Sequence, residues 1–430
     1  MGFLPCPLPC QSKKKTLDSD QTQSRHLSSD SSSSLSLSSR SLSLSSRSFS
    51  SLYSQPSLPS VPSLTISSSQ AEHLSNTSHY CLATLTGHSS YIFCLSLAGK
   101  HLYSGSSNGE ILICDRNPSR QDNYSKENIV SRSGSAVKSI VIMEDKLFSA
   151  HQDHRIRVWK IDNETPNRHY KCIATLPTLN DRCIKLFWTR NYVQVRRHKK
   201  CTWVHHVDTV SALALSQDGS LIYSASWDRT FKVWRTSDFK CLESVWDAHE
   251  DAINSIVIAK NGHVYTGSAD KKIKIWNKQE GSNNHTLMTT LEKHKSAVNA
   301  LALSTDGSVL YSGACDRSII VWEKDSGGVK QMVVSGALRG HKKSILCLAV
   351  VSDLVCSGSA DKTVRIWTRG FGKSYSCLAV FEGHRGPVKC LTAALDSEKG
   401  DSCSGNSYLV YSGSLDCDVN VWKLWVPKYL

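Results

Sequence analysis

From residue 80 onward the chain repeats one pattern of hydrophobic and polar positions. A short alternating stretch is followed, after a polar turn, by a second one that ends in tryptophan, as in YSASWDRTFKVW at 223–234. Alternation is typical of β-strands, which place successive side chains on opposite faces of a sheet. Seven such stretches end at Cys114, Trp159, Trp234, Trp276, Trp322, Trp367 and Trp422, at intervals of 45, 75, 42, 46, 45 and 55 residues.

The half of each repeat that precedes this pattern is also regular. A histidine stands four residues before an alternating apolar stretch in most copies, as Gly87-His88 does before YIFCLSL and His294 before AVNALAL. Turn signals such as SQDG and STDG separate the stretches and favour hairpins. Repeats of about 40–45 residues with these features predict an all-β fold, a seven-bladed β-propeller.

Polar residues recur at fixed positions within each repeat. A hydroxyl lies ten residues before the final residue in all seven copies, and a carboxylate lies six residues before it in six. The hydroxyls are Ser104, Ser149, Ser224, Thr266, Ser312, Ser357 and Ser412, and the carboxylates are Asp153, Asp228, Asp270, Asp316, Asp361 and Asp416. The first repeat departs with Asn108 and Cys114, and the second has Ser133 where the histidine belongs.

These motifs resemble the WD40-repeat β-propeller family over residues 80–430. The resemblance implies one hydrogen-bond network per blade, formed by a histidine, a hydroxyl, an aspartate and a tryptophan, which satisfies polar groups buried in the sheet. Carried onto this chain, the network residues are His206, Ser224, Asp228, Trp234, His249, Thr266, Asp270, Trp276, His294, Ser312, Asp316, Trp322, His341, Ser357, Asp361, Trp367, His384, Ser412, Asp416 and Trp422.

Serine, histidine and aspartate are also the members of a hydrolase triad. A catalytic triad is needed once, whereas this set recurs in nearly every repeat, so we interpret it as structural. No phosphate-binding loop and no single, unrepeated triad is present in the sequence. We therefore expect no enzyme, no catalytic residue and no cofactor.

The tryptophan that ends the last repeat, Trp422, stands eight residues from the C-terminus, which leaves the final blade without an outer strand. Residues 80–88, YCLATLTGH, match SCLAVFEGH at 376–384, so we expect residues 80–86 to complete that blade and close the ring. Deletion of residues 1–86 should then cause aggregation, and deletion of residues 1–70 should not.

Residues 1–79 are expected to form a disordered, serine-rich tail. Between residues 21 and 70 serine dominates, and apolar residues occur singly, so the segment cannot bury enough surface to offset the entropy of ordering. Arginine stands three residues before Ser28, Ser43 and Ser50, a spacing that basophilic kinases favour and that a serine-rich tail also produces by chance.

The extreme N-terminus resembles a dual-acylation anchor, with Gly2, Cys6, Cys10 and the basic run Lys13–Lys15. The residue at position 6 departs from the myristoylation pattern, which requires serine or threonine there. Three prolines interrupt the short apolar run, so the segment does not read as a signal peptide. No apolar stretch of 18 residues is present, and we expect no membrane association.

Composition adds little to this picture. The formal net charge is +14, which is compatible with acidic partners but is also common in proteins that bind none. The sixteen cysteines include no C-x2-C pair, so we expect no metal site. Scattered thiols, several of them within apolar runs, favour a reducing compartment, and we expect the cytoplasm and the nucleus.

The 75-residue interval contains an insertion, residues 178–203. We expect it on the top rim, because it lies between the last strand of one blade and the first strand of the next. Exposed aromatic and arginine side chains form interaction hot spots. The predicted partner-binding residues are Trp227, Arg196, Arg197, Lys199, Lys200 and Trp203, the alternatives being a solvated loop, a nuclear-import patch or packing of Trp203 onto the body.

The combination LPTLxD, NYVxVRRHxxxxW and HxDxVS, together with the serine-rich tail, resembles the plant Jingubang-type WD-repeat proteins. That resemblance implies a non-enzymatic regulator that acts through protein contacts, including transcription regulators or signalling proteins, in the lineage tied to control of pollen germination.

Two other functions compete with a monomeric protein-binding scaffold. A substrate receptor of a cullin-type ubiquitin ligase often carries W-D-x-R after a blade, and no tryptophan here is followed by that pattern. Binding of anionic lipid or nucleic acid rests on the positive charge alone, so we do not expect nucleic acid to be a direct partner.

Overall fold

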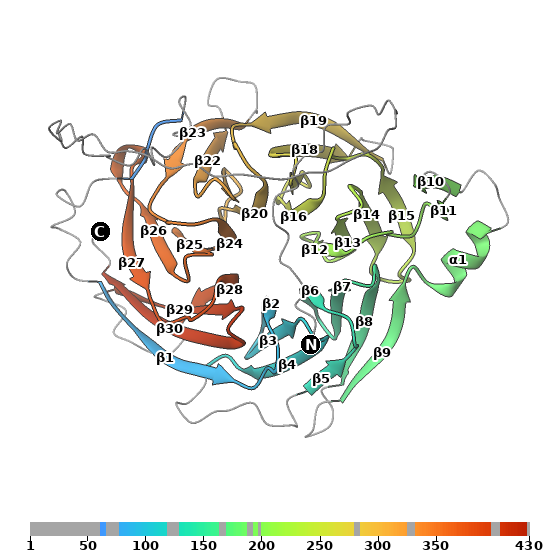
Figure 1. Cartoon of the computed structure of the whole chain (residues 1–430), viewed down its shortest axis with the longest axis horizontal. Helices are drawn as coiled ribbons and strands as arrows, with labels where there is room; N and C mark the ends of the chain where they lie inside the picture. The colour runs from blue at the N-terminus through green and yellow to red at the C-terminus, as the bar shows by residue number, and fades with distance from the viewer. Residues whose placement is uncertain are drawn as a thin grey trace, which may run out of the picture. The chain divides into compact units, whose positions relative to one another are not determined.

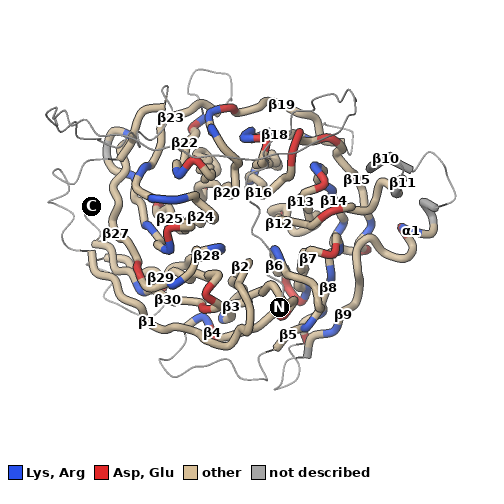
Figure 2. Tube along the Cα trace, in the orientation of Figure 1, with Lys and Arg blue, Asp and Glu red and all other residues tan. Residues whose placement is uncertain are grey.

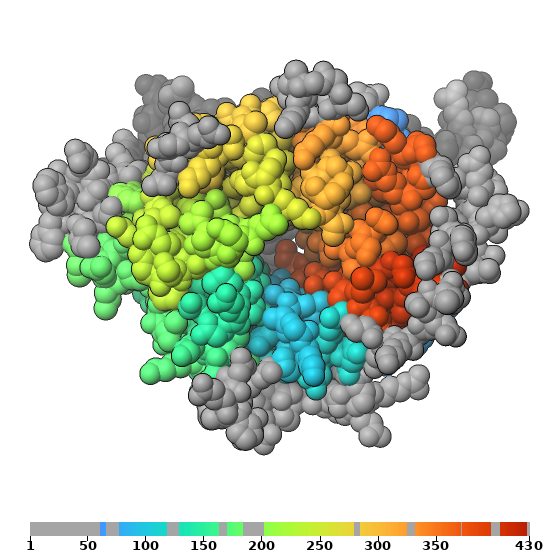
Figure 3. All heavy atoms as spheres, turned by 180° about the vertical axis from the view of Figure 1, so that it is seen from behind, coloured from blue at the N-terminus to red at the C-terminus, as the bar shows by residue number. Residues whose placement is uncertain are grey.

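A computed structural model of the chain describes residues 61–65, 77–117, 129–162, 169–186, 192–196, 199–278, 284–324, 332–396 and 405–427. All of them belong to one compact unit, Pro56–Leu430. They form seven four-stranded antiparallel sheets, a separate two-stranded sheet and a single α-helix. The seven sheets are arranged as a ring around a central opening (Figures 1 and 3), so the predicted seven-bladed β-propeller is confirmed.

Each blade runs from an inner strand at the central opening to an outer strand at the circumference. Blade 1 contains β2 (Ile92–Ala98), β3 (His101–Ser106), β4 (Glu110–Asp115) and β5 (Ile129–Arg132), and blade 2 contains β6 (Val137–Met143), β7 (Lys146–His151), β8 (Ile156–Asp162) and β9 (His169–Leu176). Blade 3 contains β12 (Val210–Leu215), β13 (Leu221–Ser226), β14 (Phe231–Arg235) and β15 (Cys241–Val245), and blade 4 contains β16 (Ile253–Ile258), β17 (Val264–Ser268), β18 (Lys272–Lys278) and β19 (His285–Glu292).

The remaining blades follow the same order. Blade 5 contains β20 (Val298–Leu303), β21 (Val309–Ala314), β22 (Ile319–Lys324) and β23 (Met332–Leu338), and blade 6 contains β24 (Ile345–Val351), β25 (Leu354–Ser359), β26 (Val364–Arg369) and β27 (Tyr375–Phe381), with the 3-10 helix η5 (Phe371–Lys373) before β27. Blade 7 contains β28 (Val388–Leu395), β29 (Gly405–Ser414), β30 (Asp418–Pro427) and, as its outer strand, β1 (Ser78–Thr86).

β1 joins the two ends of the propeller. It pairs antiparallel with β30 from Ser78 opposite Trp425 to Thr86 opposite Asp418. The side chain of Leu85 is 1% exposed and belongs to the core cluster between blades 7 and 1. An N-terminal strand thus satisfies the backbone groups of β30 that an open blade would leave as an exposed edge.

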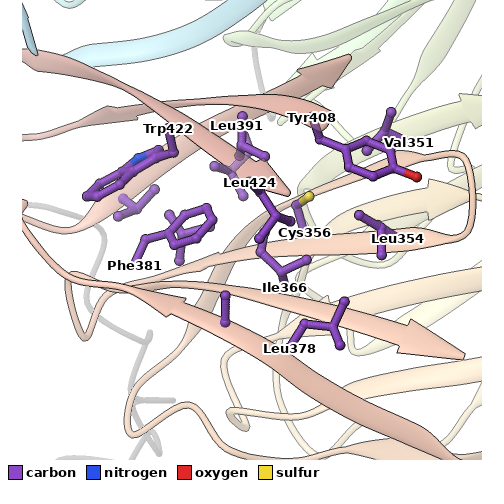
Figure 4. Close-up of a cluster of buried hydrophobic side chains, with 14 of the residues drawn as sticks. Val351, Leu354, Cys356, Ile366, Leu378, Phe381, Leu391, Tyr408, Trp422 and Leu424 are labelled. Atoms are coloured by element: carbon purple, nitrogen blue, oxygen red, sulfur yellow. The ribbon is translucent and has the colours of Figure 1, made fainter. Parts of the chain in front are cut away.

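The hydrophobic core is divided among the interfaces between blades. A cluster of buried aliphatic and aromatic side chains lies between each pair of neighbouring blades. Figure 4 shows the cluster between blades 6 and 7, where Trp422 and Phe381 stack with ring centroids 5.0 Å apart. Because each blade buries its faces only against its neighbours, the ring is the unit that is stable.

The tail predicted over residues 1–79 requires a correction at two places. Residues 61–65 pack against the propeller, and β1 already begins at Ser78. Val61 and Leu64 find apolar contacts between blades, which a serine-rich composition does not reveal. The predicted phosphorylation sites Ser28, Ser43 and Ser50, and the acylation residues Gly2, Cys6 and Cys10, lie outside the described residues.

Candidate functional site

Blades 3 to 7 each contain the same chain of side-chain hydrogen bonds. In blade 3 the Trp234 indole N–H donates to Ser224 Oγ (2.9 Å), the Ser224 hydroxyl bonds His206 Nε2 (2.8 Å), and His206 Nδ1 donates to Asp228 Oδ2 (2.9 Å). The other four blades repeat these contacts at 2.8–2.9 Å, through His249, Thr266, Asp270 and Trp276; His294, Ser312, Asp316 and Trp322; His341, Ser357, Asp361 and Trp367; and His384, Ser412, Asp416 and Trp422.

The network ties four parts of a blade together. The histidine lies in the connection that enters the blade, the hydroxyl on the second strand, the aspartate in the next turn, and the tryptophan on the third strand. In blade 3, Asp228 also accepts hydrogen bonds from the backbone N–H groups of Val207 (2.9 Å) and Thr230 (3.0 Å). One carboxylate therefore fixes both the entry loop and the turn.

Burial decides what these groups do. The hydroxyls of the network residues are completely buried, and burial lowers the pKa of His206, although Asp228 opposes that shift. Burial alone would raise the pKa of Asp228, but the charge and hydrogen bond of His206 bring it below its usual range. Because Ser224 is enclosed and its oxygen already accepts the indole N–H, the Ser-His-Asp set connects the parts of the blade and stabilises it.

Blade 2 replaces the missing histidine with one from another strand. His151, at the end of β7, bonds the Ser149 hydroxyl through Nε2 (2.8 Å), and Trp159 donates to the same oxygen (2.9 Å). The hydroxyl oxygen of Ser133, the residue at the usual histidine position, lies 3.2 Å from His151 Nδ1. The sequence held a signal for this exchange, because the repeat without a histidine before its first strand is the one with a histidine two residues after its hydroxyl.

In blades 1 and 2 the carboxylate position also differs. Asn108 bonds Ser89 in blade 1, and Asp153 in blade 2 pairs with Arg157 (2.6 Å). Burial lowers the pKa of both His88 and His151 to about 4. Both imidazoles are therefore neutral in the folded protein at pH 7.

This difference predicts a loss of stability at mildly acidic pH. An unfolded histidine has a pKa of about 6.5, so between pH 6.5 and pH 4 the unfolded state binds protons that folded His88 and His151 do not. The stabilisation is complete above pH 6.5 and decreases as the pH falls toward 4. We expect each histidine to remove about 2 kcal/mol of unfolding free energy between pH 7.5 and pH 5.

Urea unfolding at the two pH values measures this loss of unfolding free energy. His151→Gln should reduce the loss by about this amount, and an unchanged loss in His151→Gln would contradict the assignment.

The rim that carries the network turns and the entry connections, here called the upper rim, also holds an aromatic–cation cluster. Lys138 Nζ lies 3.8 Å from the ring centroid of Phe93 and 5.7 Å from that of Trp227. Phe93 and Lys138 occupy the bulges of the inner strands of blades 1 and 2, and Trp227 lies in the turn between β13 and β14. All three side chains are partly exposed. Sequence reasoning identified Trp227 but not its two neighbours.

The bulge residues of the next three blades do something else. Ser211, Asn254 and Asn299 each donate to a backbone carbonyl of the following blade, at 2.5, 2.9 and 2.7 Å. Phe93 and Lys138 instead contact each other, and Lys138 also contacts Trp227. Ser211, Asn254 and Asn299 therefore connect neighbouring blades. Phe93 and Lys138 instead form part of the exposed surface of the upper rim.

The insertion between blades 2 and 3 forms elements of its own. It forms α1 (Leu179–Leu186) and a hairpin, β10 (Tyr192–Arg196) and β11 (Lys199–Thr202), which lie at the outer circumference (Figure 1). Asp181 accepts a hydrogen bond from the backbone N–H of Cys241 on β15 (3.1 Å), which fixes the insertion to blade 3.

The predicted residues of the insertion have different fates. Trp203 packs against the core cluster between blades 2 and 3, and its carbonyl accepts a bond from the buried Lys232 (2.6 Å). Arg197 lies outside the described residues, as do the side chains of Arg196, Lys199 and Lys200. The packing of Trp203 follows from local apolar neighbours that its surrounding basic sequence does not reveal.

Basic residues also gather on the upper rim of blades 6 and 7. Lys342, Lys343, Lys362 and Arg385 are exposed, and none of these four forms an ion pair with another described residue. The backbone N–H groups of Lys342 and Arg385 bond Asp361 and Asp416, so the networks place these cations on the rim. Figure 2 shows blue along the connection between β23 and β24.

Two other kinds of site were sought in the part of the chain that the structure describes. No group of three histidine, cysteine, aspartate or glutamate side chains there is arranged to hold a metal ion. No helix there has the length and apolar character needed to cross a membrane.

Comparison with known proteins gives a consistent picture. Six segments of the chain match the family model described as WD domain, G-beta repeat: residues 79–115, 198–235, 239–277, 285–323, 332–368 and 375–423. The gap between the first two segments contains blade 2, in which His151 replaces the usual histidine.

Two curated proteins are similar to the chain. It is 30% identical over 170 residues to the small ribosomal subunit protein RACK1 of Drosophila melanogaster, an alignment that covers 38% of this chain and 52% of that protein. It is 23% identical over 286 residues to autophagy-related protein 16 of Arabidopsis thaliana, covering 61% and 52%. The chain thus spans about half the length of these relatives.

Among solved structures, the WD40 β-propeller domain of Doa1 is similar, with a TM-score of 0.58 and 19% sequence identity. That alignment covers 80% of this chain and 96% of the Doa1 domain.

Proposed function

Because the chain belongs to the WD40 repeat family, we propose that it is a non-enzymatic scaffold that binds other proteins through the upper rim around Trp227. WD40 propellers generally serve as protein-interaction scaffolds. The observation that supports this use of the rim is the cluster of Phe93, Lys138 and Trp227, in which two aromatic rings flank a cation and all three remain partly exposed. Aromatic side chains at the centre of an interface contribute most of its binding free energy.

The chain itself suggests substitutions that preserve the fold. At the position of Trp227, blades 4 and 6 have Ala269 and Ala360, and at the position of Phe93 blade 3 has Ser211. The double variant Phe93→Ser/Trp227→Ala therefore installs residues that other blades of the same ring already use. We expect the affinity of this variant for its principal partners to fall by about thirtyfold or more, the effect of a hot spot worth about 2 kcal/mol.

The measurement is a quantitative pull-down from native cells, with wild-type and variant chains as baits. Tyr80→Ala, which removes an exposed aromatic ring from β1 on the outer edge, is the matched control and should keep the partners. Arg196→Ala/Arg197→Ala tests the predicted contribution of the insertion separately. An unchanged set of partners for the double variant would move the binding surface away from Trp227.

A second function, binding of anionic surfaces, is supported by the unpaired cations of blades 6 and 7. The residue after each of the five network aspartates has a positive φ, a conformation that favours glycine. Four of these five residues are basic, Arg229 (70°), Lys271 (74°), Arg317 (69°) and Lys362 (75°), and the fifth is Cys417 (75°). This function predicts partners that still bind the Phe93→Ser/Trp227→Ala variant but dissociate at higher salt and from a Lys342→Glu/Lys343→Glu variant. Such partners are assigned to this basic surface.

The finer assignment extends the same proposal. The motif resemblance of the insertion and the serine-rich tail supports a Jingubang-type plant regulator, acting in cytoplasm and nucleus on signalling or transcription proteins. The pull-down distinguishes it from a cullin-ligase substrate receptor, because the latter would retain ligase components.

A further inference from the structure

Residues 61–65, Val-Pro-Ser-Leu-Thr, lie across the outer edge of blade 5 and reach blade 6. The backbone N–H of Ala337 on β23 donates to the Pro62 carbonyl (2.9 Å), and the N–H of Leu64 donates back to the Ala337 carbonyl (3.0 Å). The N–H of Tyr375, the first residue of β27, donates to the Leu64 carbonyl (2.9 Å). The segment is the blue trace beside β23 in Figure 1, and its blue atoms lie against the orange blades in Figure 3.

The side chains of this segment enter two different interfaces. Val61 is 5% exposed and belongs to the core cluster between blades 4 and 5, and Leu64 packs against the cluster between blades 5 and 6. Residues three apart in an extended chain point to opposite sides, which suits this arrangement. Pro62 and Ser63, between them, are exposed. The contact thus depends on Val61, Leu64 and the backbone.

Blade 5 is shaped to receive a leucine. A Cβ atom added at Gly336 of β23 would have three side-chain carbons of Leu64 as its nearest neighbours, at 2.4–2.9 Å. The outer-strand residues at the equivalent register in five other blades carry a side chain: Ala83, Ala174, Glu243, Thr289 and Ala379. Glycine therefore stands where the leucine needs the space.

We propose that the outer edge of blade 5 is a binding site for an extended Val-Pro-x-Leu segment, filled in cis by residues 61–65 and open to a partner protein that carries the same pattern. The site uses strand addition: backbone hydrogen bonds from Ala337 and Tyr375 give affinity, and the seats for valine and leucine give selectivity. It is separate from the upper rim, so it is independent of the proposed function there.

Tethering explains how so short a segment holds its place. One buried and one partly buried aliphatic side chain, with three backbone hydrogen bonds, correspond to a Kd on the order of a millimolar for the free peptide. Residues 66–76 join the segment to Thr77 before β1, and a linker of this length gives an effective concentration on the order of millimolar. Because the two values are comparable, the bound and released states are nearly balanced, and a longer partner segment with further contacts displaces residues 61–65.

Hydrogen exchange of the full-length chain tests the site at the two donor amides. In wild type we expect protection of the Ala337 and Tyr375 N–H groups. Leu64→Asp places a charge in the apolar seat and should reduce that protection by about twofold, the amount that a nearly balanced cis contact supplies. Adding a synthetic peptide of residues 58–67 at millimolar concentration should restore it. The matched control is a peptide of residues 52–61, which has Pro56-Ser57-Leu58 in the same spacing but Gln55 in place of the valine, and it should not.

Gly336→Ala provides a second route to the same answer should Leu64→Asp disturb folding. The three atoms nearest to its added methyl group all belong to Leu64, so it should expose the Tyr375 amide without restoration by the peptide. Equal protection in wild type and both variants, or no effect of the 58–67 peptide on Leu64→Asp, would overturn the proposal. Protection in wild type that rises with protein concentration would assign the occupant to a second copy and overturn the cis arrangement.

Discussion

Replacing Asp228 by alanine is expected to lower the free energy of unfolding by about 3–5 kcal/mol, because it breaks a buried pair and leaves its partner behind. Asp228 and His206 are each 1% exposed at the side chain. The carboxylate accepts from His206 Nδ1, from the backbone N–H groups of Val207 and Thr230, and from the Thr230 hydroxyl (2.6 Å). Alanine removes the acceptor of these four donors. His206 Nδ1 and the Thr230 hydroxyl still lie 3.2 Å from each other, whereas the two backbone N–H groups lose the acceptor that replaced water on folding.

Asp153→Ala in blade 2 is the matched control for this experiment. It occupies the same turn position, but its side chain is 33% exposed and pairs with Arg157 in place of a histidine. A partly exposed ion pair contributes little, so we expect a loss below about 1 kcal/mol. Urea unfolding followed by tryptophan fluorescence compares the two. Equal losses would mean that the turn, and not the buried network, determines the stability of a blade.

The repeated elements were predictable because the same physical requirement recurs in every blade. A buried indole N–H needs an acceptor, and a buried imidazole needs a partner on each nitrogen, so the hydroxyl and the carboxylate return at fixed spacing. Seven blades, the network residues of blades 3 to 7 and the place of the closing strand could be read in this way. The separation of residues 80–86 from the last blade did not obscure their match to other outer strands.

Features that occur once were not predictable from periodicity. His151 reaches the same hydroxyl as its counterparts from a different strand, and only the fold shows that the two backbone positions converge. Val61 and Leu64 stand in a serine-rich segment whose average composition predicts no packing, yet two side chains and a glycine on a distant strand are sufficient. The neighbours of Trp227 come from blades 1 and 2, over a hundred residues away in the case of Phe93.

The N-terminal region has two boundaries. The repeat pattern predicts that the propeller begins at residue 80, whereas the packing of residues 61–65 moves the first described contact to residue 61. Deletion of residues 1–60 keeps residues 61–65 and β1, which make the N-terminal contacts that the structure describes. We expect this truncated chain to remain a monomer in size-exclusion chromatography with an unchanged melting temperature. Deletion of residues 1–70 keeps β1 but removes Val61 and Leu64, and should lower the free energy of unfolding by less than about 1 kcal/mol, because the segment exchanges between its bound and released states.

Deletion of residues 1–86 is expected to have the largest effect, aggregation of the chain. It removes β1, exposes the backbone groups of β30 from Asp418 to Trp425, and opens the core cluster that Leu85 fills between blades 7 and 1. An exposed ten-residue edge strand pairs readily with other chains. Light scattering and the soluble yield compare the three truncations. A soluble, monomeric 87–430 chain would show that the ring closes without β1, because β30 would then have to be protected in another way.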